Sequence, residues 1–516
     1  MLSKVGVRDN MPLPRGVVDS RRRFWHNLAV MSHIDSSRRR FLKLAGAAGL
    51  AAASPLPAFG FTDAAWSSLF STTGADDAWK EAAAIVARVV APRFPDRDFD
   101  ITRYGAVVDG ATDCTAAVAQ AIAACSRAGG GRVVVPKGEF LTGPIHLKSR
   151  VNLHVAAGAV LRFQRDPQRY LPLVFTRFEG VECMNYSPLI YAFEQENVAV
   201  TGTGTLDGNA GDAHWWPWKG RDPKEKASTA NQLAARTKLI EMAAKGVPVA
   251  ERVFGDGSYL RPNFVQPYRC KNVLIEGVTI INSPMWELHP VLCANVTVRN
   301  VNIRSHGPNN DGCDPESCRD VLIEGCTFDT GDDCIALKSG RNDDGRRLNA
   351  PIENVVIRDC VMKDGHGGVV VGSEISGGAR NIFAERCRMD SPNLDRGLRI
   401  KTNSVRGGTT EHIYMRDCTI GSVTEAVVTV NLFYEEGDTG KFPPTVRDIE
   451  VRNVTSKKGQ YALLLRGYTH TPISDIRIID CVFDGVEKPD LVEGVKGLVL
   501  ANTRINGQLK NETINR

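Results

Sequence analysis

The sequence repeats one short phrase along its C-terminal half, and this repeat constrains the fold more than any other feature. Eight copies begin at positions 272, 295, 320, 354, 381, 412, 448 and 475, and read NVLIEGVTI, NVTVRNVNI, DVLIEGCTF, NVVIRDCVM, NIFAERCRM, HIYMRDCTI, DIEVRNVTS and DIRIIDCVF. Their starts lie 23 to 36 residues apart. This spacing is typical of solenoids, in which each unit buries its apolar face against its neighbours.

Each copy has apolar residues at its second and fourth positions, and most copies then have two polar or glycine positions followed by a further apolar-x-apolar run. This pattern predicts a period-two strand, a bend and a second short strand. The seventh position holds only valine or cysteine: Val278, Val301, Cys326, Cys360, Cys387, Cys418, Val454 and Cys481. Both are small and apolar, so we expect most thiols to stack inside the solenoid rather than to bind metal or form disulfides. The repeat therefore predicts an all-β fold, a right-handed parallel β-helix.

Segments outside the repeat predict how the solenoid is completed. VNLHVAAGAVLRF from Val151 and NVAVTGTGTLDGN from Asn197 are typical of earlier coils, and CTAAVAQAIAACSRAGGG from Cys114 predicts an N-terminal capping helix. DDAWKEAAAIVARVV from Asp76 predicts a second amphipathic helix. We thus expect an N-terminal helical segment at 61–98, a β-helix domain at 99–507 with a helical insert at 211–262, and a C-terminal tail at 508–516.

Residues 1–60 are predicted to be an export signal with an upstream extension. They carry ten Lys/Arg and three Asp, a net charge of +7, and subtracting this from the overall +5 leaves −2 for the remaining chain. Net charge therefore gives no support for nucleic-acid binding. SSRRRFLKLAGAAGLAAASPLPAFG resembles a bacterial twin-arginine signal at Arg38 and Arg39, followed by an apolar run too short for a membrane span. We expect a periplasmic or secreted protein, with no membrane contact after signal removal; the alternative is a basic tail.

A group of carboxylates follows the core-forming phrases. Asp332 and Asp333 stand side by side in TGDDCIALKSG, and Asp311, in NNDGCDP, precedes Asp332 by about one coil. Neighbouring coils stack about 4.8 Å apart, so the three carboxyls are expected to lie close together in one groove. Close carboxyls split their pKa values, because a second negative charge raises the affinity for a proton. One protonated and one ionised carboxyl are what glycoside cleavage requires.

The same groove is expected to hold cationic and aromatic groups from later coils. His366 lies in DGHGG, Arg399 and Lys401 share one face of GLRIKT by period two, and Tyr434 follows in VNLFYEEG. A cationic pair on one face suits a ligand that bears a carboxylate.

These motifs, in this order, resemble the four signatures of the polygalacturonase family of glycoside hydrolases: Asn309-Asn310-Asp311, Gly331-Asp332-Asp333, Gly365-His366-Gly367 and Arg399-Ile400-Lys401. Asn310 stands where threonine is more usual. The resemblance covers about residues 99–507 and implies hydrolysis of α-1,4-linked galacturonic acid in pectin with inversion, without a metal or other cofactor.

By the resemblance, Asp332 is the general acid, Asp311 and Asp333 hold and activate the water, and His366 tunes the acid. Substrate binding falls to Asn309, Arg399, Lys401 and Tyr434. The insert and VGSEISGG (371–378) resemble exo-acting members, whose inserts close one end of the groove, so we expect attack at the non-reducing end of galacturonides.

Four alternatives remain at this point. The substrate could be rhamnogalacturonan or xylogalacturonan, the enzyme a Ca²⁺-dependent pectate lyase, or the protein a non-catalytic β-helix that binds sugars. The tryptophans of HWWPW (214–218) could either pack the insert or stack on sugar rings.

Overall fold

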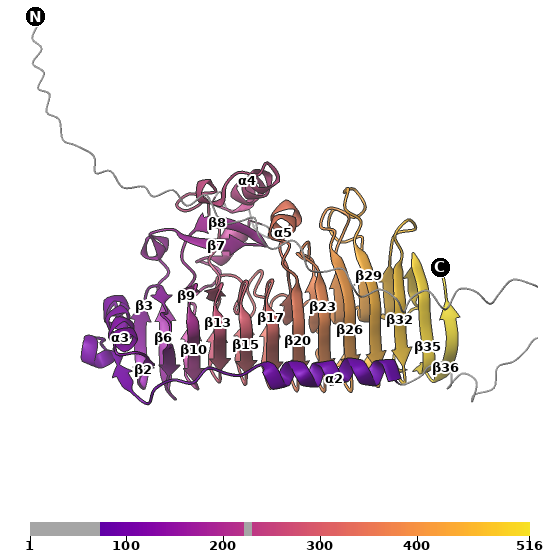
Figure 1. Cartoon of the computed structure of the whole chain (residues 1–516), viewed down its shortest axis with the longest axis horizontal. Coiled ribbons are helices and arrows are strands. Elements are labelled where there is room, and N and C mark those ends of the chain that lie inside the picture. Colours follow the sequence, from indigo (N-terminus) through magenta and orange to yellow (C-terminus); the bar gives the residue numbers. More distant parts are fainter. Residues whose placement is uncertain (1–72, 221–229) are drawn as a thin grey trace, which may run out of the picture. The chain divides into compact units, whose positions relative to one another are not determined.

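The computed structural model describes residues 73–220 and 230–516, and the predicted export signal lies outside this part. The described chain winds into a right-handed parallel β-helix, as the repeat predicts (Figure 1). One row of strands runs in chain order as β1 (Asp98–Asp100), β2 (Gly131–Val135), β5 (Val151–Val155), β10 (Glu196–Gly202), β13 (Lys271–Glu276), β15 (Ala294–Arg299), β17 (Arg319–Glu324), β20 (Ile352–Arg358), β23 (Ala379–Glu385), β26 (Thr409–Arg416), β29 (Thr445–Arg452), β32 (Ile473–Ile479) and β35 (Val495–Ile505).

A second row in the same sheet follows the bend of each coil. It comprises β3 (Gly138–Thr142), β6 (Ala159–Phe163), β11 (Thr205–Asp207), β14 (Thr279–Ile281), β16 (Asn302–Ser305), β18 (Thr327–Thr330), β21 (Val361–Met362), β24 (Arg388–Met389), β27 (Thr419–Ser422), β30 (Thr455–Lys458) and β33 (Val482–Phe483). All neighbours in both rows pair in parallel.

A third row closes each coil. Its strands are β4 (Ile145–His146), β9 (Ile190–Phe193) and β12 (Val265–Tyr268), then β19 (Ile335–Leu337), β22 (Val369–Gly372), β25 (Arg396–Lys401), β28 (Ala426–Asn431), β31 (Tyr461–Arg466) and β34 (Leu491–Glu493). Single bridges through Leu288 and Cys313 connect β12 to β19. This row carries the candidate site.

The first residue of each repeat has a backbone reason that periodicity alone does not reveal. All eight positions adopt a left-handed conformation with φ between 53° and 58°, and they are Asn, Asp or His. These residues tolerate that conformation better than most. Their side chains also bond between coils: the Asn295 amide donates to Asn272 Oδ1 at 2.7 Å. The recurring Asn, Asp or His therefore marks the same left-handed backbone position in all eight repeats.

The interior is aliphatic and contains the thiols. All thirteen cysteines are free and buried, and the five at the seventh repeat position form part of one continuous core. The prediction that cysteine replaces valine in the stack is thus confirmed. Burial of this apolar surface along the solenoid axis is the main source of its stability.

Two helices cover exposed parts of the solenoid. Helix α3 (Thr115–Arg127) packs its apolar side, including Val118 and Ile122, onto the first coils and is the predicted capping helix. Helix α2 (Thr73–Arg88) lies across the outside of β17 to β26, where Trp79 meets Phe383 with ring centroids 5.4 Å apart (Figure 1). No helix of the described residues is long and apolar enough to cross a membrane.

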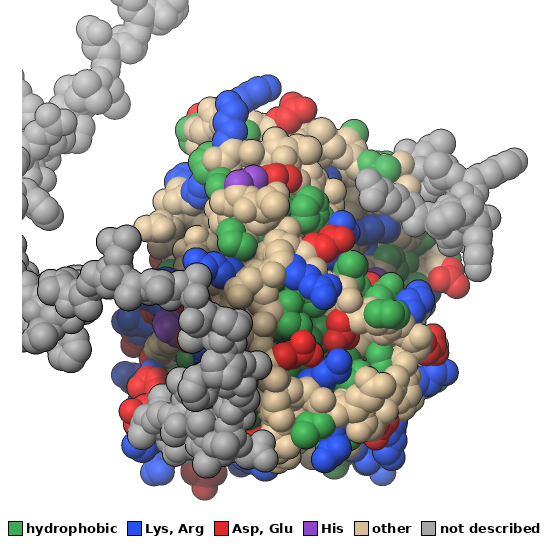
Figure 2. Space-filling view, turned by 90° about the vertical axis from the view of Figure 1, so that its right-hand side faces the viewer, with side chains coloured by type: hydrophobic (Ala, Val, Ile, Leu, Met, Phe, Trp, Pro, Cys, Tyr) green, Lys and Arg blue, Asp and Glu red, His purple; other side chains and the backbone are tan. Residues whose placement is uncertain are grey.

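The C-terminal end differs from a simple tail. Residues 508–516 carry strand β36 (Gln508–Ile514), which pairs antiparallel with β35. A further coil would pair in parallel with β35, but β36 pairs with β35 in the antiparallel direction and so ends the parallel stack. On the face at this end, charged side chains of both signs are interspersed with hydrophobic ones (Figure 2).

The insert and a hairpin form a second layer beside the third row of strands. The insert contains the 3₁₀ turns η3 (Trp216–Lys219) and η4 (Val249–Glu251) and helix α4 (Leu233–Ala244). Strands β7 (Val174–Phe178) and β8 (Val181–Asn185) form an antiparallel hairpin that sequence reasoning missed, and α5 (Asn342–Leu348) was missed as well. The insert and hairpin share an apolar cluster that includes Phe178, Leu239 and Trp286. Two further 3₁₀ turns are η1 (Ile101–Tyr104) and η2 (Pro167–Tyr170).

Candidate active site

Successive coils bring the predicted carboxyls together. Parallel pairing sets Cys313 beside Ile335, so Asp311 and Asp333, each two residues earlier, occupy equivalent places on adjacent coils. The Gly312 amide donates to the Asp333 carbonyl at 2.9 Å, and the His366 amide donates to the Asp332 carbonyl at 3.0 Å. One oxygen from each of Asp311, Asp332 and Asp333 lies within 4.8 Å of the others. The predicted alignment of the three carboxyls is therefore present in the structure.

A cavity of about 420 Å³ opens above these carboxyls. It is lined by seven of the eight residues predicted for the site, namely Asn309, Asp311, Asp332, His366, Arg399, Lys401 and Tyr434. The eighth, Asp333, is fully buried next to the lining. All eight therefore gather at one place.

The three carboxyls differ sharply in exposure. The side chain of Asp332 is 18% exposed, whereas those of Asp311 and Asp333 are 4% and 0% exposed. Asp332 is thus the carboxyl that a ligand in the cavity reaches most directly.

Asp333 is held as a carboxylate by two cations. Lys401 Nζ lies 2.6 Å from one of its oxygens and Arg399 Nη1 lies 3.1 Å from the other. Burial opposes ionisation, but the charges of Lys401 and Arg399 outweigh it and lower the pKa of Asp333. The ring of Tyr434 lies over both cations, 5.2 Å from Lys401 Nζ and 5.7 Å from the Arg399 guanidinium carbon. This packing fixes the cationic pair beneath an aromatic ring.

Asp332 and His366 form a second pair, at the mouth of the cavity. His366 Nδ1 lies 2.9 Å from Asp332 Oδ1, and the imidazole is 51% exposed. The hydrogen bond to Asp332, against the effect of burial, raises the pKa of His366 to about 9. Burial raises the pKa of Asp332, yet the hydrogen bond and charge of His366 outweigh it and lower that pKa. The pair is therefore an imidazolium beside a carboxylate at neutral pH.

Asp311 behaves in the opposite way. Burial, followed by the negative charge of Asp332, raises the pKa of Asp311 well above its usual value. Lys338, with Nζ 3.5 Å from Asp311 Oδ2, only partly offsets this. The predicted split of pKa values is present, but it is the pKa of Asp311 that is raised, whereas that of Asp332 is lowered.

Sequence reasoning missed Lys338, although it lies in the same phrase as Asp332 and Asp333. Its register position matches Gly372 and Lys401 on the next two coils of the third row. Extending the period-two pattern of that phrase by one step would have placed it beside the cationic pair. Lys338 Nζ also lies 3.4 Å from Glu374 Oε2 and 4.4 Å from the ring centre of Trp286.

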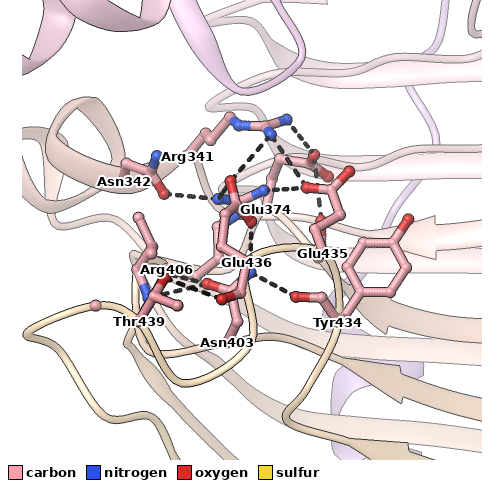
Figure 3. Close-up of polar contacts among 12 residues, drawn as sticks. Arg341, Asn342, Glu374, Asn403, Arg406, Tyr434, Glu435, Glu436 and Thr439 are labelled. Carbon is pink, nitrogen blue, oxygen red and sulfur yellow. Dashed lines mark hydrogen bonds and ion pairs between the residues drawn. The ribbon is translucent and has the colours of Figure 1, made fainter.

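A buried arginine links three walls of the cavity (Figure 3). Arg341 Nη1 lies 3.1 Å from Glu374 and 3.2 Å from Glu179 at the tip of the β7–β8 hairpin. Its Nη2 lies 3.2 Å from Glu435, which Arg406 also binds at 2.6 Å. Glu435 directly follows Tyr434, so this network positions the aromatic ring over the cations. The repeat carries no signal for a network that spans a hairpin, a helix start and a loop.

The insert contributes the remaining wall through Lys219, Gln232, Leu233 and Arg236. Arg236 Nε lies 2.5 Å from Glu179. The side-chain oxygen of Asn309 accepts hydrogen bonds from Lys219 and from Arg261, the latter at 2.7 Å. These bonds turn the Asn309 amide nitrogen away from the two cations, which leaves it available as a donor.

The tryptophans of HWWPW pack the insert. Trp215 is buried, its ring lies 4.8 Å from that of Trp218, and Trp216 Nε1 donates to the Ser283 carbonyl at 2.9 Å. None of the three lines the cavity, whereas Trp286 does. Of the two readings of this motif, packing is the one that the structure supports.

Comparisons with known proteins agree with this geometry. Residues 255–501 match the family model described as "Glycosyl hydrolases family 28". A solved structure titled as a hyperthermoactive exopolygalacturonase from Thermotoga maritima is 49% identical, with a TM-score of 0.82, and the match covers 85% of this chain and 98% of that one.

Two curated relatives are more distant. A "Probable polygalacturonase" from Vitis vinifera is 29% identical over 391 residues, which cover 73% of this chain and 72% of the relative. An "Exo-poly-alpha-D-galacturonosidase" from Dickeya chrysanthemi is 28% identical, and the match covers 69% of this chain and 61% of the relative.

Proposed function

Since the chain belongs to glycosyl hydrolases family 28, we propose that it hydrolyses α-1,4-galacturonosidic bonds of pectic galacturonan from the chain end, with the eight gathered residues as its catalytic and binding groups. The observation that carries this proposal is a group of three adjoining carboxyls in the cavity, of which Asp332 is accessible while Asp311 and Asp333 are buried, next to a cationic pair. Rhamnogalacturonan and xylogalacturonan are less favoured as substrates, since the similar proteins described above are polygalacturonases or exo-acting galacturonosidases by name.

Arg399 and Lys401 are suited to the carboxylate of the sugar on the leaving-group side. Together they carry two positive charges but share one carboxylate, Asp333. A galacturonate carboxylate would complete this charge balance, and the ring of Tyr434 gives the sugar an apolar surface.

Asp332 is suited to protonate the glycosidic oxygen because it is the most accessible carboxyl of the three. It is ionised in the free protein, so it must receive a proton, and the adjacent imidazolium of His366 can supply one at 2.9 Å. A bound galacturonate brings a further negative charge and displaces water, and both changes favour the neutral form of Asp332. Substrate binding therefore prepares the acid.

Asp311 and Asp333 are suited to hold the attacking water from below. Asp333 is ionised and can accept a proton from that water, while Oδ1 of Asp311 has no partner among residues 73–220 and 230–516 and is free to bind it. Asn309, with its amide nitrogen available, can donate to a sugar hydroxyl at the same side.

We infer the stereochemical outcome from the burial of Asp311 and Asp333 rather than from the distance between the carboxyls. Oxygens within 4.8 Å of one another are close for an inverting pair, for which the carboxyls usually stand about 6.5–9.5 Å apart. However, a retaining enzyme needs a second carboxylate that can bond to the sugar, and Asp311 and Asp333 are both too buried for that. Water held by these two carboxyls, with the Asp333 carboxylate as the proton acceptor, can attack instead, so we propose inversion.

The wall formed by the insert and the β7–β8 hairpin supports attack at the chain end. Lys219, Gln232, Leu233 and Arg236 of the insert and Glu179 of the hairpin line the same cavity as the catalytic carboxyls. A cavity bounded in this way favours a chain terminus over the middle of a polymer.

The twin-arginine motif supports export, with processing near Ala58–Gly60. We propose that the solenoid, including its C-terminal strand β36, acts outside the cytoplasm. Replacement of Arg38 and Arg39 by lysine should leave the protein in the cytoplasmic fraction, and unchanged export would contradict this assignment.

Proton NMR of the first product tests the mechanism. Hydrolysis of an α-linked galacturonan by inversion yields the β-anomer first, before mutarotation. Asp332→Asn should remove this signal, whereas Asp329→Asn, a nearby carboxyl outside the cavity, should retain it. Initial release of the α-anomer would overturn the assignment of Asp311 and Asp333 as water-holding groups.

A further inference from the structure

The charged groups that line the cavity are paired, with one exception. The lining contains six lysines and arginines, the imidazole of His366, which pairs with Asp332, and five carboxyls. Lys338 and Arg341 bind Glu374, Arg236 binds Glu179, and Arg399 and Lys401 bind Asp333. Within residues 73–220 and 230–516, no carboxylate lies within ion-pair distance of Lys219.

The ammonium of Lys219 instead donates to the neutral side-chain oxygen of Asn309. Lys219 is the last residue of η3, a turn fixed by the packed tryptophans that precede it. Burial, which dominates over the charge of Glu179, lowers the pKa of Lys219. A partly buried cation without a counter-charge is costly, and a carboxylate ligand would remove that cost.

The position of Lys219 relative to the carboxyls identifies which sugar it can reach. Asn309, its partner, lies on the coil before Asp332, whereas Arg399 and Lys401 lie two coils after it. Coils are stacked about 4.8 Å apart, so Asp332 stands between the two cationic positions. A ligand cleaved at Asp332 therefore has one sugar beside Arg399 and Lys401 and the other beside Lys219.

On the basis of the function proposed above, we infer that Lys219 binds the carboxylate of the sugar at the non-reducing end of the substrate. The sugar in this position is then recognised by its acidic group, and a neutral terminal sugar is disfavoured. Arg236 does not compete for this role, since its guanidinium bonds Glu179 at 2.5 Å.

Lys219 could instead serve only to orient Asn309, and substrate chemistry separates the two roles. The probes are a trimer of α-1,4-linked galacturonate and the same trimer with galactose as the non-reducing unit. If Lys219 donates a charge-assisted hydrogen bond to the terminal carboxylate, the wild type should prefer the acidic trimer about 10- to 100-fold in kcat/KM. Lys219→Met should lose that preference by slowing hydrolysis of the acidic trimer alone.

Two further variants complete the test. Lys219→Arg keeps the charge and should keep most of the preference, and Lys245→Met, at an exposed lysine of the same insert, should behave as the wild type. Equal losses on both trimers with Lys219→Met, or a wild type without preference, would overturn the inference while the proposed hydrolysis stands. A wild type that cleaves neither trimer would remove the proposed function itself, and the inference with it.

Discussion

The pair formed by His366 and Asp332 can be tested by replacing His366 with glutamine. Glutamine is similar in size and can still donate a hydrogen bond to Asp332, but it carries no exchangeable charge near neutral pH. In the wild type the pair retains one proton up to the pKa of His366, about 9. Activity is therefore expected to fall only as the pH rises through that value.

The size of the loss in His366→Gln follows from the fraction of Asp332 that is still protonated when the imidazolium is absent. Without the imidazolium, Asp332 must hold a proton alone, and an ordinary aspartate with a pKa of about 3.9 is protonated in roughly one molecule in 10³ at pH 7. Burial of Asp332 raises that fraction. We therefore expect kcat/KM at pH 7 to fall about 10²- to 10³-fold, within the range that a general acid contributes.

Initial rates of reducing-end release from oligogalacturonide, measured between pH 4 and pH 10, provide the assay. The alkaline limb should move several pH units toward acid in His366→Gln, so that the ratio of wild-type to variant rates narrows as the pH falls. His470→Gln is the control, because His470 forms a comparable pair with Asp438 at 2.8 Å outside the cavity. An unchanged alkaline limb, or the same loss at every pH, would refute the reasoning.

Three further changes test the fold and the buried charges. Lys401→Met should lower the free energy of unfolding by about 3 kcal/mol at pH 7, since Asp333 loses a buried partner. Because the pKa of Asp333 is lowered in the folded state, the stability from its ion pair is complete above the unfolded pKa of about 3.9 and is lost as the pH falls through the folded pKa. The difference in unfolding free energy between wild type and Lys401→Met, measured by denaturant titration, should therefore be smaller at acidic pH than at pH 7. An equal difference at the two pH values would contradict this. Cys360→Val should cost less than about 1.5 kcal/mol in the same titration, and a much larger loss would show that the thiol does more than pack. Asn295→Ala should lower stability by about 1–2 kcal/mol and Asn295→Gly by less, because φ is 58° at this position; equal melting temperatures for both variants would contradict that explanation.

The solenoid was predictable because its signal is local and repeated. Each copy of the phrase has the period-two pattern of a strand, and eight copies establish the repeat length of the solenoid, which one copy could not do. The same alternation assigned the thiols to the interior and Arg399 and Lys401 to one face. Positions such as Asp311 and Asp333 then align because parallel coils hold equivalent residues in register.

The rest of the site depends on segments that break the repeat. The sequence of the β7–β8 hairpin does not match the repeat, and nothing in it indicates that its strands pair antiparallel beside the coils. Lys219 and Arg236 reach the cavity because the insert packs on Phe178 and Trp286, a contact between segments distant in sequence. The raised pKa of Asp311 depends first on its burial, and burial cannot be read from the sequence.

The most direct test of chain-end hydrolysis compares viscosity with reducing ends during digestion of polygalacturonate. We predict small products from the first time points and a steady rise in reducing ends with little loss of viscosity, and no products from Asp332→Asn. A rapid fall in viscosity at low conversion would contradict chain-end attack, and a wild type that releases no reducing ends from polygalacturonate would contradict the assigned substrate.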